Sequence, residues 1–203
     1  MKTYFLAFAI FFLLMAAACT STQLSSSWKE PGKTVSVEKL NKVLVVVLFK
    51  YETTRRKAED EMVKYLKGKG IVSYNYLNNN FDPNNEEALR TKIKAAGFDG
   101  AVTMRLIDVD KEKQFIPGNT AYPTYNRNFS SYYYKNWPLY NTPGYYSTTK
   151  IFTVETNIYS IKEDKIIWTG LTKTTDPEGV EVMMKEIIKV IYKRMVKEGF
   201  ISN

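Results

Sequence analysis

Apolar residues along this chain change their spacing in a way that predicts alternating strands and helices. Residues 42–49, KVLVVVLF, are almost continuously aliphatic, which is typical of a strand buried on both faces within a parallel sheet. Residues 54–69 and 82–97 instead place apolar side chains every three to four positions, as amphipathic helices do. Further strands are predicted at 71–77 and 98–110. With right-handed crossovers, this βαβαβ order predicts three largely parallel strands.

The last third of the chain predicts an antiparallel pairing. Residues 150–161 alternate apolar and polar positions, the sequence KEDK provides a turn, and residues 166–171 return as a second strand of a hairpin. Asp176 and Pro177 predict the N-cap and first turn of a final helix. We expect its apolar stripe to lie on the sheet; the stripe consists of Val180, Met184, Ile187, Ile188, Ile191 and Met195. The predicted fold class is therefore α/β with mixed α+β character, in which helices flank one mixed sheet.

The first residues predict export. Lys2 precedes an uncharged apolar run at 4–15, which is typical of a secretory signal and shorter than the roughly twenty residues of a membrane-spanning helix. The sequence MAAAC then ends at Cys19, the only cysteine, and this resembles the lipobox of bacterial lipoproteins. The resemblance implies a signal peptide over 1–18 and a covalent diacylglycerol and N-acyl chain on Cys19, with no other cofactor. The alternative is a free cysteine beside an ordinary cleavage site.

The residues after Cys19 predict where the protein lies. Residues 19–27 are mostly small and polar, which predicts a lipidated, flexible tether ahead of one α/β domain over 28–203. Because Thr20 follows the cysteine in place of an aspartate, the lipoprotein resemblance implies the outer membrane of the cell envelope. Loss of Lys2 with the signal changes the formal net charge from +8 to +7. We expect the membrane and anionic lipids or envelope polymers as counterparts, and no nucleic acid; a merely soluble basic surface is the alternative.

The composition excludes several kinds of catalysis. The chain has no histidine, so neither Ser-His-Asp nor Cys-His catalysis is possible. Asp108, Asp110 and Glu112 alternate at a strand end and are interpreted as a solvated strand end, with carboxylate hydrolysis as the alternative; no metal site is predicted there. Arg55 and Arg56 lie in the first turn of the first helix, where an anion or a partner would offset their repulsion by the helix dipole. A solvated basic end balanced by the three acids at 59–61 is the alternative.

The segment at 113–149 is predicted to be a long insertion loop, because prolines at 117, 123, 138 and 143 disfavour a regular helix or central strand. No acid occurs between Glu112 and Glu155. Tyrosine and tryptophan combine an apolar ring with a polar group, which suits binding surfaces. The candidate binding residues are Tyr132, Tyr133, Tyr134, Trp137, Tyr140, Tyr145 and Tyr146. The alternative is that these rings cover an exposed part of the sheet.

Several stretches together resemble a known family. They are SSWKEP, KVLVVVLF with TTRRKAEDEMVKYLKGKG, and ETNIYSIKEDKIIWTG before the last helix. They resemble an uncharacterised family of small lipoproteins common in the Bacteroidetes, whose expected fold is similar to the N-terminal α/β domain of TolB. The resemblance implies an address and a fold, without an activity. We therefore predict a non-catalytic binding module for a protein or an envelope polymer; the alternatives are a carboxylate-dependent hydrolase and a lipid or glycan carrier.

Overall fold

The structure is a computed structural model that describes residues 21–77, 85–118, 128–140 and 143–202. Its centre is one six-stranded mixed sheet with the order β1-β6-β5-β4-β2-β3. The strands are β1 Thr22–Lys29, β2 Val43–Leu48, β3 Gly70–Val72, β4 Gly100–Ile116, β5 Tyr145–Ser160 and β6 Lys165–Thr175. As predicted, β2 pairs in parallel with β3 and β4, while β5 and β6 form an antiparallel hairpin. The predicted mixed sheet is confirmed.

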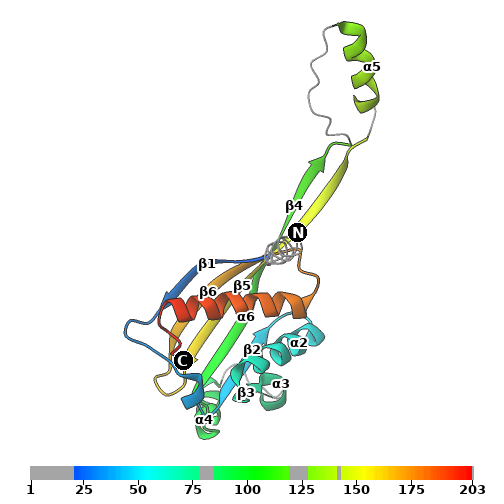
Figure 1. The fold of residues 1–203 in the computed structure, drawn as a ribbon. Helices are drawn as coiled ribbons and strands as arrows, with labels where there is room; N and C mark the ends of the chain where they lie inside the picture. The colour runs from blue at the N-terminus through cyan, green and yellow to red at the C-terminus, as the bar shows by residue number, and fades with distance from the viewer. Residues whose placement is uncertain (1–20, 78–84, 119–127, 141–142, 203) are drawn as a thin grey trace, which may run out of the picture.

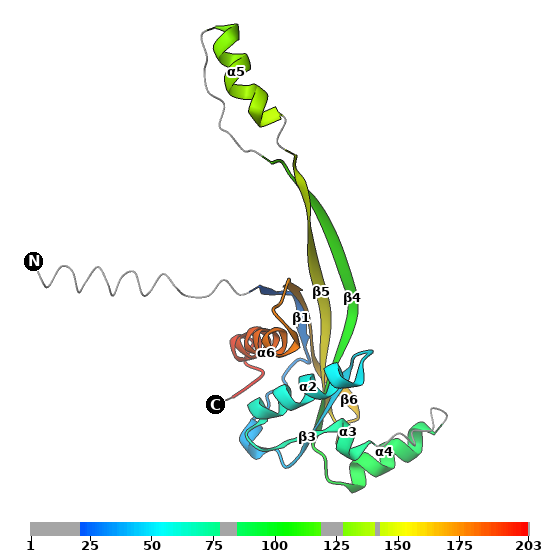
Figure 2. The ribbon, with the colours of Figure 1, turned by 90° about the vertical axis from the view of Figure 1, so that its right-hand side faces the viewer.

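Helices cover the two faces of the sheet unequally. Helices α2 (Glu52–Val63) and α6 (Val180–Lys197) lie on one face, where the larger core includes Val45, Met104 and Trp168. Short helices α3 (Ser73–Tyr76) and α4 (Glu86–Ala95) lie on the other face, over a smaller core around Leu44, Phe98 and Ala101. Two single 3-10 turns, η1 Val37–Lys39 and η2 Lys64–Leu66, connect these elements. Figures 1 and 2 show this layering.

The predicted stripe of α6 is confirmed on the sheet, but the predicted start of this helix is wrong. The helix begins at Val180 after Gly179, without a side-chain cap. Asp176 instead continues the β5–β6 pairing: its carboxylate accepts from the Lys150 backbone N–H (2.7 Å), and its own N–H donates to the Lys150 carbonyl (2.8 Å). An aspartate next to proline fits a helix cap or a strand-closing turn equally well by sequence, and tertiary contacts choose between them.

The predicted strand at 71–77 is much shorter than expected. Strand β3 ends at Val72, and the chain turns into α3, whose first residue Ser73 donates to the buried carboxylate of Glu59 through both its N–H and its hydroxyl (2.6 Å each). Glu59 also accepts from the Val47 N–H (3.1 Å), so it ties α2 to β2 and to α3. A single buried acid therefore ends the strand, because it offers the backbone a better partner than a further ladder bond. The helix predicted from residue 82 begins after Asn85, which caps the Ala88 N–H (3.0 Å); Asp82 and Pro83 lie outside the described residues.

The flexible tether predicted at 19–27 is wrong for residues 22–27, which belong to β1. This strand pairs with β6 from Thr22↔Thr174 to Lys29↔Trp168. The Ser21 and Thr22 hydroxyls also donate to Glu186 of α6, each at 2.8 Å. Small polar residues are typical of linkers, but serine and threonine also pair well at the edge of a sheet when partners lie on both sides. The strand is therefore held by α6 and β6 together.

Candidate functional site: the aromatic arm

Strands β4 and β5 continue well beyond the rest of the sheet. The last β5–β6 pair is Ile151↔Thr175, whereas β4 and β5 continue through six more pairs, from Lys111↔Lys150 to Ile116↔Tyr145. At about 3.4 Å per residue this two-stranded extension is about 20 Å long. Helix α5 (Phe129–Tyr140) lies beyond its end, and Figures 1 and 2 show both standing away from the body. We call this extension together with α5 the arm.

The expectation of an irregular loop over 113–149 is therefore wrong for residues 113–116, 129–140 and 145–149, which form strands and a helix. Pro117 directly follows β4 and Pro143 precedes β5, so both lie outside the ladder and remove no bond from it. Pro138 is inside α5 but close to its end, where a missing N–H removes only one intrahelical bond. These prolines are tolerated because they lie at or near the ends of strands and a helix. Where those strands and that helix end is known only from the three-dimensional structure. Pro123 lies outside the described residues.

One face of α5 carries a ladder of aromatic rings. Phe129, Tyr133 and Trp137 are spaced four residues apart, and their ring centroids are separated by 5.9 Å and 5.2 Å. These rings are 77%, 45% and 49% exposed, and Tyr134 beside them is 82% exposed. Tyr132 is exposed as well, and Tyr140 is the last residue of the helix. We call Phe129, Tyr133 and Trp137 the aromatic ladder.

The remaining predicted tyrosines lie on the strands of the arm. Tyr146 packs against Phe115 across the ladder, with ring centroids 5.2 Å apart, and Tyr145 faces Ile116. Gly144 allows this contact, because a Cβ at that position would lie 2.3 Å from the Phe115 ring. The predicted aromatic residues are thus split between helix and strands. Their position on the arm argues against the alternative prediction, in which these rings cover an exposed part of the sheet.

Asp108, Asp110 and Glu112 lie at the root of the arm and on its first residues. All three are exposed, and Asp108 follows an irregularity in β4 and accepts from the neighbouring Val109 N–H (2.8 Å). Within the described ranges, no group of three acidic, cysteine or histidine residues is arranged to hold a metal ion. The carboxylates are spread along one strand, and their cross-strand partners on β5 are Thr153, Ile151 and Thr149, none of which is an acid.

Arg55 and Arg56 are paired within their own helix. The Glu52 carboxylate accepts hydrogen bonds from Arg56 Nε (2.7 Å) and from Arg55 Nη2 (3.1 Å). Arg55 Nε also lies 3.0 Å from this carboxylate, without hydrogen-bond geometry. Hydrogen bonding by Arg56 and the neighbouring Arg55 charge lower the pKa of Glu52. The Arg56 guanidinium also lies 4.8 Å from the Tyr74 ring centroid. Glu52 therefore balances the charges of Arg55 and Arg56. Two of the three acids at 59–61 that the sequence suggested for this balance, Glu59 and Glu61, are buried.

The chain enters the body beside the root of the arm. Thr22 on β1 faces Thr174, Thr174 faces Phe152, and Phe152 faces Val109, so the start of β1 lies level with the point where the arm leaves the sheet. Cys19, the predicted lipid attachment site, lies outside the described residues. In the sequence only Thr20 lies between it and Ser21, the first described residue. No sequence signal showed that the start of β1 and the root of the arm lie at one end of the sheet.

Comparisons with known proteins give only weak likenesses. No family model and no curated protein matches the chain, so the resemblance to the Bacteroidetes lipoproteins stays a prediction. Among solved structures, the PelC dodecamer from Paraburkholderia phytofirmans in space group P6 has 9% identity and a TM-score of 0.41, over 82% of this chain and 94% of that one. A point variant of the same PelC dodecamer, in space group C2, has 8% identity and a TM-score of 0.43, over 82% and 96% of the two chains.

A third solved structure is lipoprotein GNA1162 from Neisseria meningitidis, with 6% identity and a TM-score of 0.40 over 77% of this chain and 98% of that one. Values this low carry no argument about function. Among the helices of the described ranges, none has the length and apolar composition needed to cross a membrane.

Proposed function

We propose that this protein is a lipid-anchored, non-catalytic binding module of the cell envelope, and that the aromatic ladder on its arm contacts a protein partner. The observation that carries the proposal is the placement of three neighbouring, exposed aromatic rings on one helix face, held away from the core. Exposed aromatic surface of this kind is rare on proteins without a partner and is enriched at interfaces. Tyrosine and tryptophan also lose little conformational entropy on binding.

The geometry of the ladder favours a protein over a polymer. The Tyr133 and Trp137 rings stack on one another at an interplanar angle of 24°. The faces that these two rings turn toward each other are therefore occupied. Sugar polymers stack on free ring faces, whereas protein side chains pack against edges and grooves as well.

The predicted lipid anchor and the arm are related in this proposal, because the start of β1, which follows the anchor, and the arm lie at the same end of the sheet. Lipidation at Cys19 would hold the start of β1 close to a membrane, and the Ser21 and Thr22 contacts with Glu186 hold that strand on the body. Because the arm leaves the same end of the sheet, its tip would then lie near that membrane at a defined place. A partner embedded in or attached to the same membrane is the natural counterpart.

The test is site-specific photo-crosslinking in intact cells. A photoreactive amino acid replaces Tyr134 on the arm in one strain and the exposed Tyr51 at the start of α2 in a matched control strain. We expect one dominant protein adduct from position 134 and none of that mass from position 51. Adducts to glycan would replace the protein partner with a polymer, and adducts only to lipid would show that the arm serves the membrane.

The anchor is tested separately with a clickable fatty acid. The wild-type chain should be labelled and sediment with the membranes, while Cys19→Ala should remain unlabelled. An unlabelled wild-type protein would refute the lipid anchor and leave the arm experiment to be judged by itself.

A further inference from the structure

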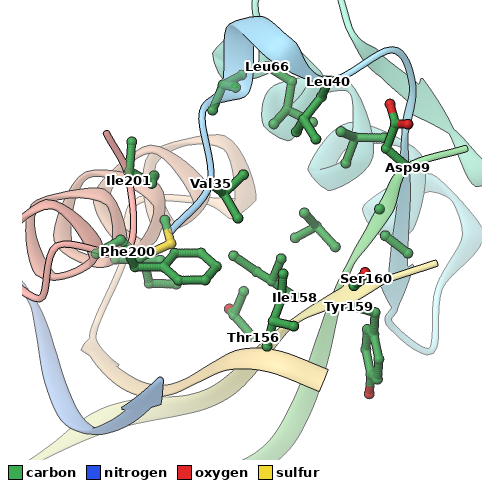
Figure 3. A pocket seen from close by; sticks show the side chains of 18 of the residues that line it. Val35, Leu40, Leu66, Asp99, Thr156, Ile158, Tyr159, Ser160, Phe200 and Ile201 are labelled. Atoms are coloured by element: carbon green, nitrogen blue, oxygen red, sulfur yellow. The ribbon is translucent and has the colours of Figure 1, made fainter. Parts of the chain in front are cut away.

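A second possible site lies inside the body, far along the sheet from the arm. A cavity of about 250 Å³ is bounded by the β2–β4–β5 part of the sheet, by α2 and α6, and by the connection from β1 to β2. Figure 3 shows Val35, Leu40 and Leu66 on one side of the space and Ile158 with Thr156 on the other; Phe200 and Ile201 lie at one end. Most of the lining is apolar.

The size of this space is unusual for a protein core. Folded cores are packed to about the density of organic crystals, and voids larger than a water molecule are few. An engineered cavity of about 150 Å³ with an apolar lining stays dry and binds benzene or xenon. The cavity here exceeds that volume, so it has room for about eight groups that each occupy roughly 30 Å³, the share of one water molecule in the liquid.

One polar group in the lining has no partner. Thr156 is 1% exposed, and within the described part of the chain its Oγ1 has no hydrogen-bond partner. The other buried threonines on this face of the sheet are bonded: the Thr172 hydroxyl donates to the Val154 carbonyl (3.2 Å), and Thr22 and Thr174 share a bond of 2.8 Å. Buried polar groups are almost always bonded, and one that is not needs an explanation. A ligand atom in the cavity supplies one.

The opposite end of the cavity is polar and reaches the surface. Asp99 and Ser160 lie there in Figure 3. Ser160 is four residues along β5 from Thr156, which corresponds to about 13 Å of strand. The rim includes Glu163 and Lys33, whose ion pair connects the β5–β6 turn with the connection from β1 to β2. The cavity is therefore elongated, apolar along its length, and open toward charged groups at one end.

From these observations we infer that the cavity binds a small neutral amphiphile, namely an alkyl or branched aliphatic chain of about eight heavy atoms that carries one hydrogen-bonding oxygen. The chain fills the apolar space, and the oxygen pairs with the Thr156 hydroxyl. A charged group at that inner end is disfavoured, because among the described residues Thr156 is the polar side chain that lines it and none of opposite charge does so. This site is independent of the aromatic ladder and of the proposed partner.

The experiment uses the full chain in lipid nanodiscs with two matched probes, a photoreactive octanol and a photoreactive octane. After irradiation, labelled peptides are identified by mass spectrometry. We expect octanol to label peptides of β5 and α6 in preference to octane, and plain 1-octanol to compete. Thr156→Val, which keeps the shape of the side chain, should reduce the preference for octanol over octane about five-fold, and Thr156→Ser should retain it.

A second variant tests the empty space itself. Val35→Phe places an aromatic ring in the cavity from the connection between β1 and β2. We expect it to reduce labelling of the cavity peptides by both probes at least about ten-fold, without lowering the midpoint of thermal unfolding. Unchanged labelling in Val35→Phe would overturn the inference, and so would an octanol preference that survives in Thr156→Val. Neither result bears on the crosslinks from the arm.

Discussion

The body and the arm of this protein differ in how far their apolar side chains are buried, although strands β4 and β5 run through both. In the body, β4 and β5 have neighbours on either side and α6 above them, so Met104 and Val154 are fully buried. In the arm, the same strands have only each other, and Phe115, Tyr145 and Tyr146 are more than half exposed. An isolated two-stranded hairpin is marginal in water, so the arm depends on the sheet from which it extends.

This difference indicates what each region contributes. Apolar side chains in the body are explained by burial, which accounts for most folding stability. Those of the arm gain little from burial, and their stabilising contribution is correspondingly small. Retaining a ladder of exposed rings there is explained by binding, and stability should be insensitive to its removal.

The largest expected effect separates the two regions through a pair of tryptophans. Trp168 is fully buried against Phe200, and its Nε1–H donates to Glu198 (2.9 Å), so Trp168→Ala should lower the free energy of unfolding by about 3–5 kcal/mol. Trp137→Ala on the arm should change it by no more than about 0.5 kcal/mol. Urea unfolding followed by circular dichroism measures both. Equal losses would show that the arm belongs to the core.

An effect of intermediate size is expected from pH. Burial by itself raises the pKa of Glu198, but hydrogen bonds from Trp168, Ser27 and Arg194 outweigh it and hold the pKa below its ordinary value of 4.5. The unfolded chain therefore binds a proton more readily, and the stabilisation is complete above about pH 4.5 and is lost as the pH falls through the folded value.

Glu198→Gln removes this contribution. At neutral pH the variant should lose about 1.5 kcal/mol of unfolding free energy, and its stability should depend less on pH below 4.5 than that of the wild type. Denaturant titrations at a series of pH values give both quantities. An unchanged slope would contradict the assigned hydrogen bonds.

The smallest effect on stability is expected from removing the arm. Lys111 and Lys150 face each other on β4 and β5, so an Asn-Gly turn can join them in place of residues 112–149. The free energy of unfolding should change by no more than about 0.5 kcal/mol, because none of the described residues in that span is buried. The same protein should lose the crosslinked partner. A loss of several kcal/mol would instead assign the arm a structural role.

Much of the fold was predictable because local patterns and global packing agree. The aliphatic run at 42–49 could be satisfied only by a strand with both faces covered, and the stripe of α6 only by a helix on a sheet. Predictions failed where a tertiary partner overrode the local pattern. Glu59 ends β3 after three residues, Asp176 closes a strand pair where a helix cap was expected, and residues 22–27 pair with β6 although they resemble a linker.

The candidate site was only partly predictable for the same reason. The aromatic residues were recognisable from composition, but their division between a helix and two strands depends on how far the β4–β5 ladder continues, which no single segment encodes. The cavity had no sequence signal, because its lining comes from elements that are far apart along the chain and each apolar residue is indistinguishable from ordinary core.

The sequence by itself determined the order of strands and helices, the absence of histidine chemistry, and the aromatic, acid-free character of residues 113–149, because these depend on residue type and near-neighbour spacing. Only the tertiary structure decided that the ends of β4 and β5 form an arm together with α5, that the start of β1 lies at its root, and that the Thr156 hydroxyl has no hydrogen-bond partner among the described residues. These features arise from strand register and from packing between distant segments. The free energies of such contacts depend on both partners and therefore cannot be read from the local sequence of either one.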